Sequence, residues 1–450
     1  MTKQTQKKKR NKLKTILVIS TSSFLFIIAV CLILVFAILT DKNTSTHQKS
    51  ENEIAEIIKK NYVKGFKNTG NSGIFSFSMD ENDINDLFEE ANEKIKDKHI
   101  SKKYYQSIDN HHYFYIDLKN TFLVKTRVVF DTVVTSINDD FSYNLGIVSS
   151  KMGKTNALTM LKKANILSED IFYSDYLPIK YNEDSNEFVV SPLTFIDSFP
   201  KSETSDLFFG IANDHLNLFS LNQSLLGFNL DFSKLSTSES SEIDLTTEYN
   251  LYNDLKTACE SVDFSSLSVG ESYTCHSINQ DVISSLLSKC CASQENEIIE
   301  SPLTEEKVIF SLTAVKAKME PDNIIELSLS YSLNAYNIDI VNEIELIDTS
   351  TTYFNSSFES RNSFKIGTYS HEGKNDKFVG VITNKIVSLF SNLAEIQSNF
   401  FTFNNNNQTL NINLETMNNN FSDFDLKYSY KSVQVNQTTK ALDFVLTKAS

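Results

Sequence analysis

The stretch DENDINDLFEEANEKI, residues 80–95, predicts the element around which the rest of the fold is organised. Its apolar residues recur every three or four positions, which places them on one face of a helix. They are Ile84, Leu87, Phe88, Ala91 and Ile95. Asp80 suits the N-cap position, because its carboxylate can accept hydrogen bonds from the first N–H groups of a helix. We therefore expect an amphipathic helix that buries this face.

The same apolar spacing recurs about 199 positions later in the chain. The recurring residues are Ile283, Leu286, Leu287 and Cys290. A short strand is expected before each helix, at Ile74–Met79 and at Glu271–Cys275, and long β-rich runs follow both helices. This order of elements predicts an internal duplication. Two unrelated α+β domains are the alternative.

Runs rich in Val, Ile, Thr, Phe and Tyr at alternating positions predict long antiparallel strands in both halves. They cover residues 112–149, Lys307–Met319 and Ile324–Ile347. Further helices are expected at Thr155–Ala164 and Phe378–Ile396, and each half ends in a strand, Glu187–Leu193 or Leu410–Leu414. The predicted fold class is α+β: one N-terminal transmembrane helix, then two similar domains of long antiparallel strands packed on amphipathic helices.

The N-terminal region carries the signature of a membrane anchor. Ile16–Leu39 runs for 24 residues without a charge and follows seven Lys and Arg residues in the first 14 positions. Such a run is long enough to cross a bilayer core of about 30 Å. The basic tail favours a cytoplasmic N-terminus and an extracellular C-terminus. We expect a single-pass cell-membrane protein with a cytoplasmic tail (1–14), a transmembrane helix (15–39) and a stalk (40–50).

A cleaved signal peptide and a lipoprotein are the two alternatives to a permanent anchor. A cleaved signal peptide has a shorter apolar region and an Ala-x-Ala-like cleavage site, whereas this run ends Phe36-Ala37-Ile38-Leu39. The segment Ile28-Ala29-Val30-Cys31 resembles a lipoprotein cleavage box, but eight apolar residues follow the cysteine within the run. Both features favour the uncleaved helix.

Length and net charge limit the domain organisation and the partners of the remaining part of the chain. About 400 residues exceed a single core, so we expect two domains, at 51–235 and 250–450. Removing the seven basic residues of the tail from the net charge of -15 leaves -22 for the rest. A surface of this sign repels nucleic acid, so nucleic-acid partners are excluded.

Three segments resemble the YpmS-type family of anchored extracytoplasmic proteins from Gram-positive bacteria. They are SFSMDENDINDLFEEANEKI (76–95), SKMGKTNALTMLKKANIL (150–167) and DYLPIKYNEDSNEFVVSPLTFID (175–197). The resemblance implies a basic tail, one anchor and a helix-and-strand outer domain; the family has no established activity. The predicted topology is also similar to that of tubular lipid-binding domains, which often occur in duplicated pairs.

Four cysteines lie close together in the part expected outside the cell. They are Cys259, Cys275, Cys290 and Cys291. An oxidising compartment favours disulfides, and we expect Cys290 and Cys291 each to bond to Cys259 or Cys275, because adjacent helical cysteines pair poorly with one another. A zinc site would need a spacing such as C-x2-C, which is absent, so we predict no metal and no cofactor.

Catalytic motifs are absent from the sequence: there is no G-x-S-x-G, P-loop, H-E-x-x-H or G-x-G-x-x-G. We interpret His111-His112 and His371-Glu372 as solvated side chains, so no enzyme activity is predicted.

Two functional hypotheses remain. In the first, the domains hold lipid or another apolar ligand between sheet and helix; in the second, they form a non-catalytic scaffold or a partner-binding ectodomain for other envelope proteins. Under the first hypothesis the helix faces would contact the ligand. The candidate residues are Ile84, Leu87, Phe88, Ile283, Leu286 and Leu287. A continuous pocket would favour lipid binding, and a packed interior would favour the scaffold.

Overall fold

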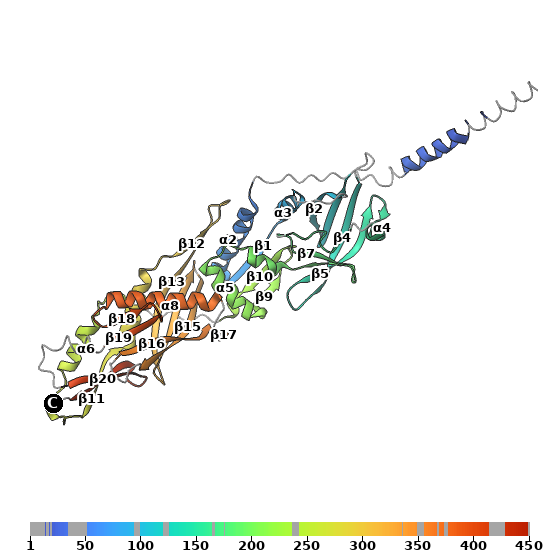
Figure 1. Ribbon diagram of the computed structural model, residues 1–450. Helices are drawn as coiled ribbons and strands as arrows, with labels where there is room; N and C mark the ends of the chain where they lie inside the picture. The colour runs from blue at the N-terminus through green and yellow to red at the C-terminus, as the bar shows by residue number, and fades with distance from the viewer. Residues whose placement is uncertain are drawn as a thin grey trace, which may run out of the picture. The chain divides into compact units, whose positions relative to one another are not determined.

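The computed structural model describes most of the chain (Figure 1). The described residues are 14, 18, 20–34, 52–93, 100–119, 126–163, 167–174, 176–235, 243–334, 336–348, 355–366, 369–372, 377–413 and 428–448.

The first half combines short helices with a long antiparallel meander. In chain order its elements are α2 (Ile54–Ser72), β1 (Ile74–Ser78), α3 (Glu81–Glu93), β2 (Ile100–Ile108), β3 (His111–Leu118), β4 (Thr126–Ile137), β5 (Tyr143–Met152), β6 (Thr155–Asn156), α4 (Leu158–Lys163), β7 (Ile179–Asn182), β8 (Glu187–Val190), α5 (Glu203–Asp214), β9 (Phe219–Leu221) and β10 (Gly227–Asp231).

The second half follows a similar order of elements. They are α6 (Leu251–Glu260), β11 (Ser272–Asn279), α7 (Gln280–Ala292), β12 (Glu297–Glu300), β13 (Lys307–Glu320), β14 (Ile324–Leu333), β15 (Tyr336–Asp348), β16 (Asn355–Ile366), β17 (Tyr369–Glu372), α8 (Lys377–Ile396), β18 (Phe401–Asn404), β19 (Thr409–Asn413), β20 (Tyr428–Asn436) and β21 (Ala441–Lys448).

The two large sheets share one strand order. The first runs β2-β3-β4-β5-β8-β7 with β6 paired to β5. The second runs β13-β14-β15-β16-β19-β18 with β17 paired to β16, and β12 is added beside β13. The small sheets, β1-β10-β9 and β11-β21-β20, also match strand for strand. Both large sheets are curled half-barrels with antiparallel pairing.

Each half joins one amphipathic helix, α3 or α7, to the strand β2 or β13 of its large sheet through side chains. In the first half, Asn85 on α3 hydrogen-bonds both the N–H and the C=O of Tyr105 on β2, at 2.8 Å each. In the second half, Ser284 on α7 accepts from Ala317 N on β13 at 2.8 Å. Asn85 and Ser284 are 199 positions apart, the spacing at which the apolar helix faces recur. This recurrence is what an internal duplication predicts.

The core of the first large sheet is aromatic. Phe88 on α3 contacts Phe172 with a ring-centroid distance of 5.9 Å, and Phe172 lies 5.0 Å from Phe114 on β3. Phe114 and Phe130 each lie 5.4 Å from Phe188 on β8. Phe88 therefore joins the helix to the aromatic core of the sheet through Phe172, and such ring contacts stabilise more than the buried area alone.

The predicted α+β class with antiparallel sheets is confirmed by the structure. The run expected at Ile324–Ile347 is divided into β14 and β15, because residues 334 and 335 separate two strands that pair with each other. The sequence patterns do not predict β2, α5 or α6. In the segment expected as a helix from Thr155 to Ala164, the structure has the two-residue strand β6 before α4 (Leu158–Lys163), and Ala164 lies outside the described residues.

The anchor expected at 15–39 is only partly described. Residues 20–34 are helical, and residues 15–17, 19 and 35–39 lie outside the described residues. Within the part of the chain that the structure describes, no helix combines the length and hydropathy needed to cross a bilayer.

The chain forms two compact units, and both are discontinuous. Unit 1 comprises Met1–Ile58, Ser78–Ser198 and Leu221–Phe228; unit 2 comprises Lys59–Phe77, Phe199–Ser220 and Asn229–Ser450. The sequence predicts two contiguous domains instead, at 51–235 and 250–450. Pairing of β1 with β10 joins residues that are distant in the chain, which is one reason why the compact units differ from a division into contiguous segments.

Candidate functional site

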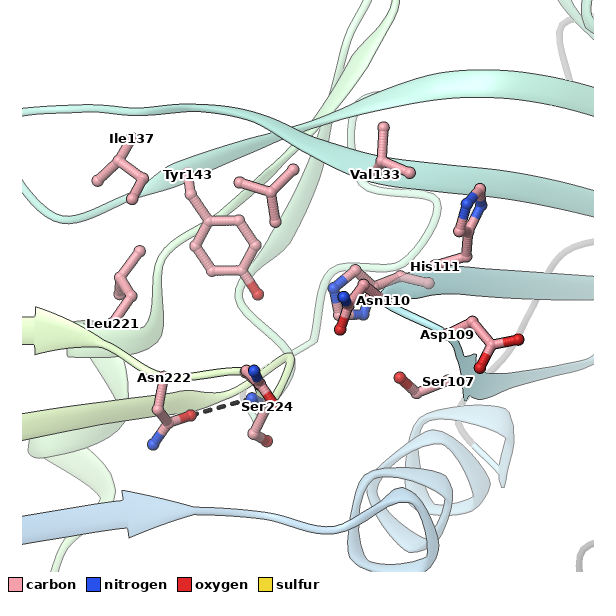
Figure 2. Close-up of a pocket in the computed structure, with 13 residues that line it drawn as sticks. Ser107, Asp109, Asn110, His111, Val133, Ile137, Tyr143, Leu221, Asn222 and Ser224 are labelled. Carbon is pink, nitrogen blue, oxygen red and sulfur yellow. Dashed lines mark hydrogen bonds between the residues drawn. The ribbon is translucent and has the colours of Figure 1, made fainter.

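A pocket of about 750 Å³ lies within unit 1 (Figure 2). Its volume is in the range typical of small-molecule sites. It is lined by the β2–β3 turn, by β4 and β5, and by the segment after β9. The lining residues are Ser107, Asp109, Asn110, His111, His112, Val133, Val134, Ile137, Tyr143, Leu221, Asn222, Gln223 and Ser224.

The β2–β3 turn forms one end of the pocket. Ile108 pairs with His111, so Asp109 and Asn110 are the two turn residues. Both have positive φ values, 49° and 64°. Tight two-residue hairpin turns require this conformation, and Asp and Asn adopt it more readily than most residues. The β2–β3 hairpin therefore ends at this turn, whereas β4 extends further in the same direction.

The apolar wall results from this difference in strand length. The register of β3 with β4 ends at His112 and Thr132, so the following residues of β4 pair with β5 alone. Val134 is 47% exposed and Ile137 is 59% exposed. Figure 2 shows Ile137, Tyr143 and Leu221 around the same space. Exposed apolar side chains beside a pocket are the kind of surface that ligands cover.

The opposite wall is a turn held in place by hydrogen bonds. Asn222 Oδ1 accepts from Ser224 N at 3.0 Å, and Ser224 Oγ donates to Met79 O at 2.6 Å. Tyr143 Oη donates to Leu225 O across the pocket floor. A Cβ at Gly227 would lie 1.8 Å from Asn222 Oδ1, so any larger residue there would displace the amide that holds Ser224 N. These contacts hold the wall in a defined position.

A buried polar group forms the inner end of the pocket. His112 is 6% exposed, and its Nδ1 lies 2.7 Å from Tyr105 Oη. Burial, together with the neighbouring His111, lowers the pKa of His112 to about 4. Burial raises the pKa of Tyr105 to about 12. Both groups are therefore uncharged at neutral pH, and the expectation that His112 is solvated was wrong.

Formal charge is scarce along the lining. None of the thirteen described lining residues is Lys or Arg. His111 Nδ1 lies 2.6 Å from Asp131 Oδ1, so its partner is a carboxylate on β4. Figure 2 shows the Asp109 carboxylate directed away from Tyr143 and Leu221. The interior of the pocket thus presents neutral polar atoms and apolar carbon.

In the second half, hydrogen bonds occupy the corresponding place. Asn323, in the β13–β14 turn, accepts from Leu346 N through its backbone oxygen at 2.8 Å. Its side-chain oxygen accepts from Val435 N on β20 at 3.1 Å. The turn is thereby tied both to β15 and to the β20–β21 hairpin, whereas in the first half these elements border a pocket.

The helix-face residues that we expected to contact a ligand lie in the cores. Ile84, Leu87 and Phe88 are buried on α3, and Leu286 and Leu287 are buried on α7; Ile283 is half-buried. None of the six lines the pocket described above.

No disulfide joins Cys259, Cys275, Cys290 or Cys291 in the structure, so the expected disulfides are not formed. The Cys259 thiol hydrogen-bonds Cys275, which together with burial raises the pKa of Cys275. Burial also raises the pKa of Cys290 to about 11 and that of Cys291 to about 12. Cys259 and Cys275 are thus each other's neighbours, while Cys291 Sγ donates to Leu287 O within α7.

Among the described residues, no group of three His, Cys, Asp or Glu side chains is arranged to hold a metal ion. Comparisons with protein-family models, with curated proteins and with solved structures gave no match.

The sequence contains a signal for only part of the pocket lining. The dipeptide Asp109-Asn110 between two β-rich runs is typical of a hairpin turn. The segment from Leu221 to Ser224 carries no comparable signal, because it reaches the pocket through pairing of β9 with β10.

Proposed function

We propose that this chain is a non-catalytic binding protein whose first half holds a small amphipathic ligand, such as a lipid, in the pocket of unit 1. The observation that carries this proposal is the pocket itself, with exposed Val134 and Ile137 on one side and neutral polar atoms at its inner end. An amphipathic ligand would cover the apolar wall and hydrogen-bond the polar end.

The proposal moves the binding site away from the helix faces. Phe88 belongs to a ring cluster with Phe172, so a ligand between α3 and the sheet would have to displace packed aromatic side chains. The pocket at the β2–β3 turn needs no such displacement.

A scaffold role is the second candidate, and it applies to the second half. There Asn323 ties the corresponding turn to β15 and β20, so a ligand would have to break hydrogen bonds to enter. One binding half and one structural half would be compatible with anchoring by residues 15–39 and with partners among envelope proteins. The resemblance to the YpmS-type family stays a prediction.

Native mass spectrometry of the purified full-length protein tests the binding function. We expect a co-purifying small molecule that is lost in Val134→Asp, because an unpaired charge disfavours apolar contact. Val148→Asp is the matched control: Val148 is 57% exposed on β5 but does not line the pocket. Loss of the molecule in both variants, or retention in both, would contradict the assignment. Absence of any molecule in the wild type, together with no binding of added lipid, would favour the scaffold.

A further inference from the structure

Resting on the proposed binding function, we propose that the ligand is an uncharged amphiphile whose oxygen atom accepts a hydrogen bond from His112 Nε2. Its apolar part would lie against Val133, Val134, Ile137 and Leu221, which line the same pocket. The inference concerns the chemistry of the polar group, which the presence of a pocket alone does not specify.

The first argument is the absence of a counter-charge. An anionic head group would find no Lys or Arg among the thirteen described lining residues. A cationic head group would have to use Asp109, whose carboxylate is directed away from the apolar side chains in Figure 2. Moving a charge from water into such a place without a partner is costly, whereas a neutral polar group can be matched by one hydrogen bond.

The second argument is that His112 stays neutral and has one occupied nitrogen. Nδ1 is hydrogen-bonded to Tyr105 Oη at 2.7 Å. His112 O accepts from Thr132 Oγ1 at 2.7 Å, which fixes the strand on which the ring is carried. His112 lines the pocket, and Nε2 is the ring nitrogen that does not contact Tyr105 Oη.

The third argument sets the direction of the hydrogen bond. Tyr105 remains a protonated phenol, because burial raises its pKa to about 12. An imidazole nitrogen is a better hydrogen-bond acceptor than a phenol oxygen, so the phenol proton of Tyr105 is directed to His112 Nδ1. The imidazole must then carry its own proton on Nε2, which makes it a donor toward the pocket. Such a chain of donors strengthens each bond and selects a ligand oxygen as acceptor.

Three probes that share one alkyl chain test the head-group chemistry: decan-1-ol, decanoate and decyltrimethylammonium. Titration into the purified full-length protein at neutral pH, below micelle formation, gives a Kd for each. We expect decan-1-ol to bind, and both charged probes to bind about tenfold or more weakly in comparison. Equal binding of all three, or tightest binding of a charged probe, would overturn the head-group inference while leaving the pocket function in place. Failure of all three to bind would count against the pocket function itself.

His112→Asn tests the donor. The shorter amide keeps an acceptor near Tyr105 but has no equivalent of Nε2, so affinity for decan-1-ol should fall about two- to tenfold, the effect of one hydrogen bond. His215→Asn is the matched control, because this imidazole does not line the pocket and its Nδ1 is engaged with Asn217 Oδ1. Unchanged affinity in His112→Asn would refute the role of Nε2.

A second measurement does not depend on the variant folding. Nitrogen-15 spectra of the wild-type histidine side chains should show His112 as the Nε2–H tautomer, with its Nε2 signal shifted when decan-1-ol is added. An Nδ1–H tautomer, or a His112 signal whose position does not change at saturating decan-1-ol, would also refute the proposal.

Discussion

Asn85 and Tyr105 form a two-point contact in which the side-chain amide replaces a neighbouring strand: Nδ2 donates to Tyr105 O and Oδ1 accepts from Tyr105 N, both at 2.8 Å. β2 is the first strand of its sheet, so within the described residues these backbone groups lack a strand partner on that side. Buried backbone groups without partners are costly, and the helix therefore completes the edge of the sheet.

The first turn of each helix makes a related contact. Ser107 N donates to Glu81 Oε2 at 2.9 Å, and Met319 N donates to Gln280 Oε1 at 3.3 Å. Glu81 and Gln280 are 199 positions apart, and Ser107 and Met319 are 212 apart. Tyr105 and Ala317 share the second spacing. Constant spacings on both elements, together with the matching strand orders, lead us to infer that the two halves are repeats.

Replacing Asn85 with Ala should destabilise the protein. The change leaves Tyr105 N and O without their side-chain partner, so we expect the free energy of unfolding to fall by about 1–3 kcal/mol. Chemical denaturation monitored by circular dichroism measures this value. Asn82→Ala, on the exposed side of the same helix, is the control and should change it by about 0.5 kcal/mol or less. Equal effects of the two variants would contradict the edge-completing role of Asn85.

Replacing Phe88 with Ala separates a core residue from a ligand contact. Phe88 is 0% exposed and contacts Phe172, so the free energy of unfolding should fall by about 3–5 kcal/mol. Ile137→Ala, at the exposed pocket wall, should stay within about 0.5 kcal/mol. The thermal unfolding transition of each variant measures this change in stability. An unchanged transition in Phe88→Ala, with loss of a bound molecule, would support the ligand-facing role expected from the helix pattern.

Acid should destabilise unit 1 through His112. Its folded pKa of about 4 lies below the ordinary value of 6.5, so the unfolded state binds the proton first as the pH falls. The contribution of His112 is therefore complete above pH 6.5, decreases between pH 6.5 and pH 4, and amounts to about 3 kcal/mol at most. Between pH 6.5 and pH 4, the free energy of unfolding measured by denaturation should fall more steeply with decreasing pH for the wild type than for His112→Asn. Parallel curves would mean that the imidazole is not buried as described.

Cys259, Cys275, Cys290 and Cys291 should behave as buried thiols that form no disulfide. In the native protein, iodoacetamide at neutral pH should label Cys290 and Cys291 slowly, because burial keeps them protonated and out of contact with the reagent. After denaturation without reductant, all four outer cysteines should be labelled, and mass spectrometry of the peptides counts them. If some of these peptides were labelled only after reduction, the disulfides expected from the sequence would be present.

The membrane topology is tested in cells. Protease added outside intact cells should remove residues 40–450 and spare the basic tail, because the seven Lys and Arg residues favour a cytoplasmic N-terminus. Immunoblots with tags at the two ends show which end is protected. A protected C-terminus in intact cells, digested only after lysis, would contradict this topology.

Local periodicity was enough to predict the helix at residues 81–93, long strands such as β4 and β13, and the antiparallel α+β class, but not β16, β20 or β21. These features depend on side chains a few positions apart, such as Leu87 and Phe88, so a short window of sequence contains the signal. The same periodicity could not say what the buried helix face contacts. Phe172 completes that contact from outside any helix or strand, and no local pattern marks it.

By itself, the sequence determined the α+β class, the strongly periodic elements such as α3 and β13, and most of the apolar faces that must be buried, because each of these follows from neighbouring residues. The tertiary structure alone decided that His112 is buried and neutral, and that the apolar end of β4 borders a pocket. Tyr143 reaches Leu225 across 82 positions, and Ser224 reaches Met79 across 145. Contacts over such distances arise only when the strands pair, so the pocket is a property of the folded chain.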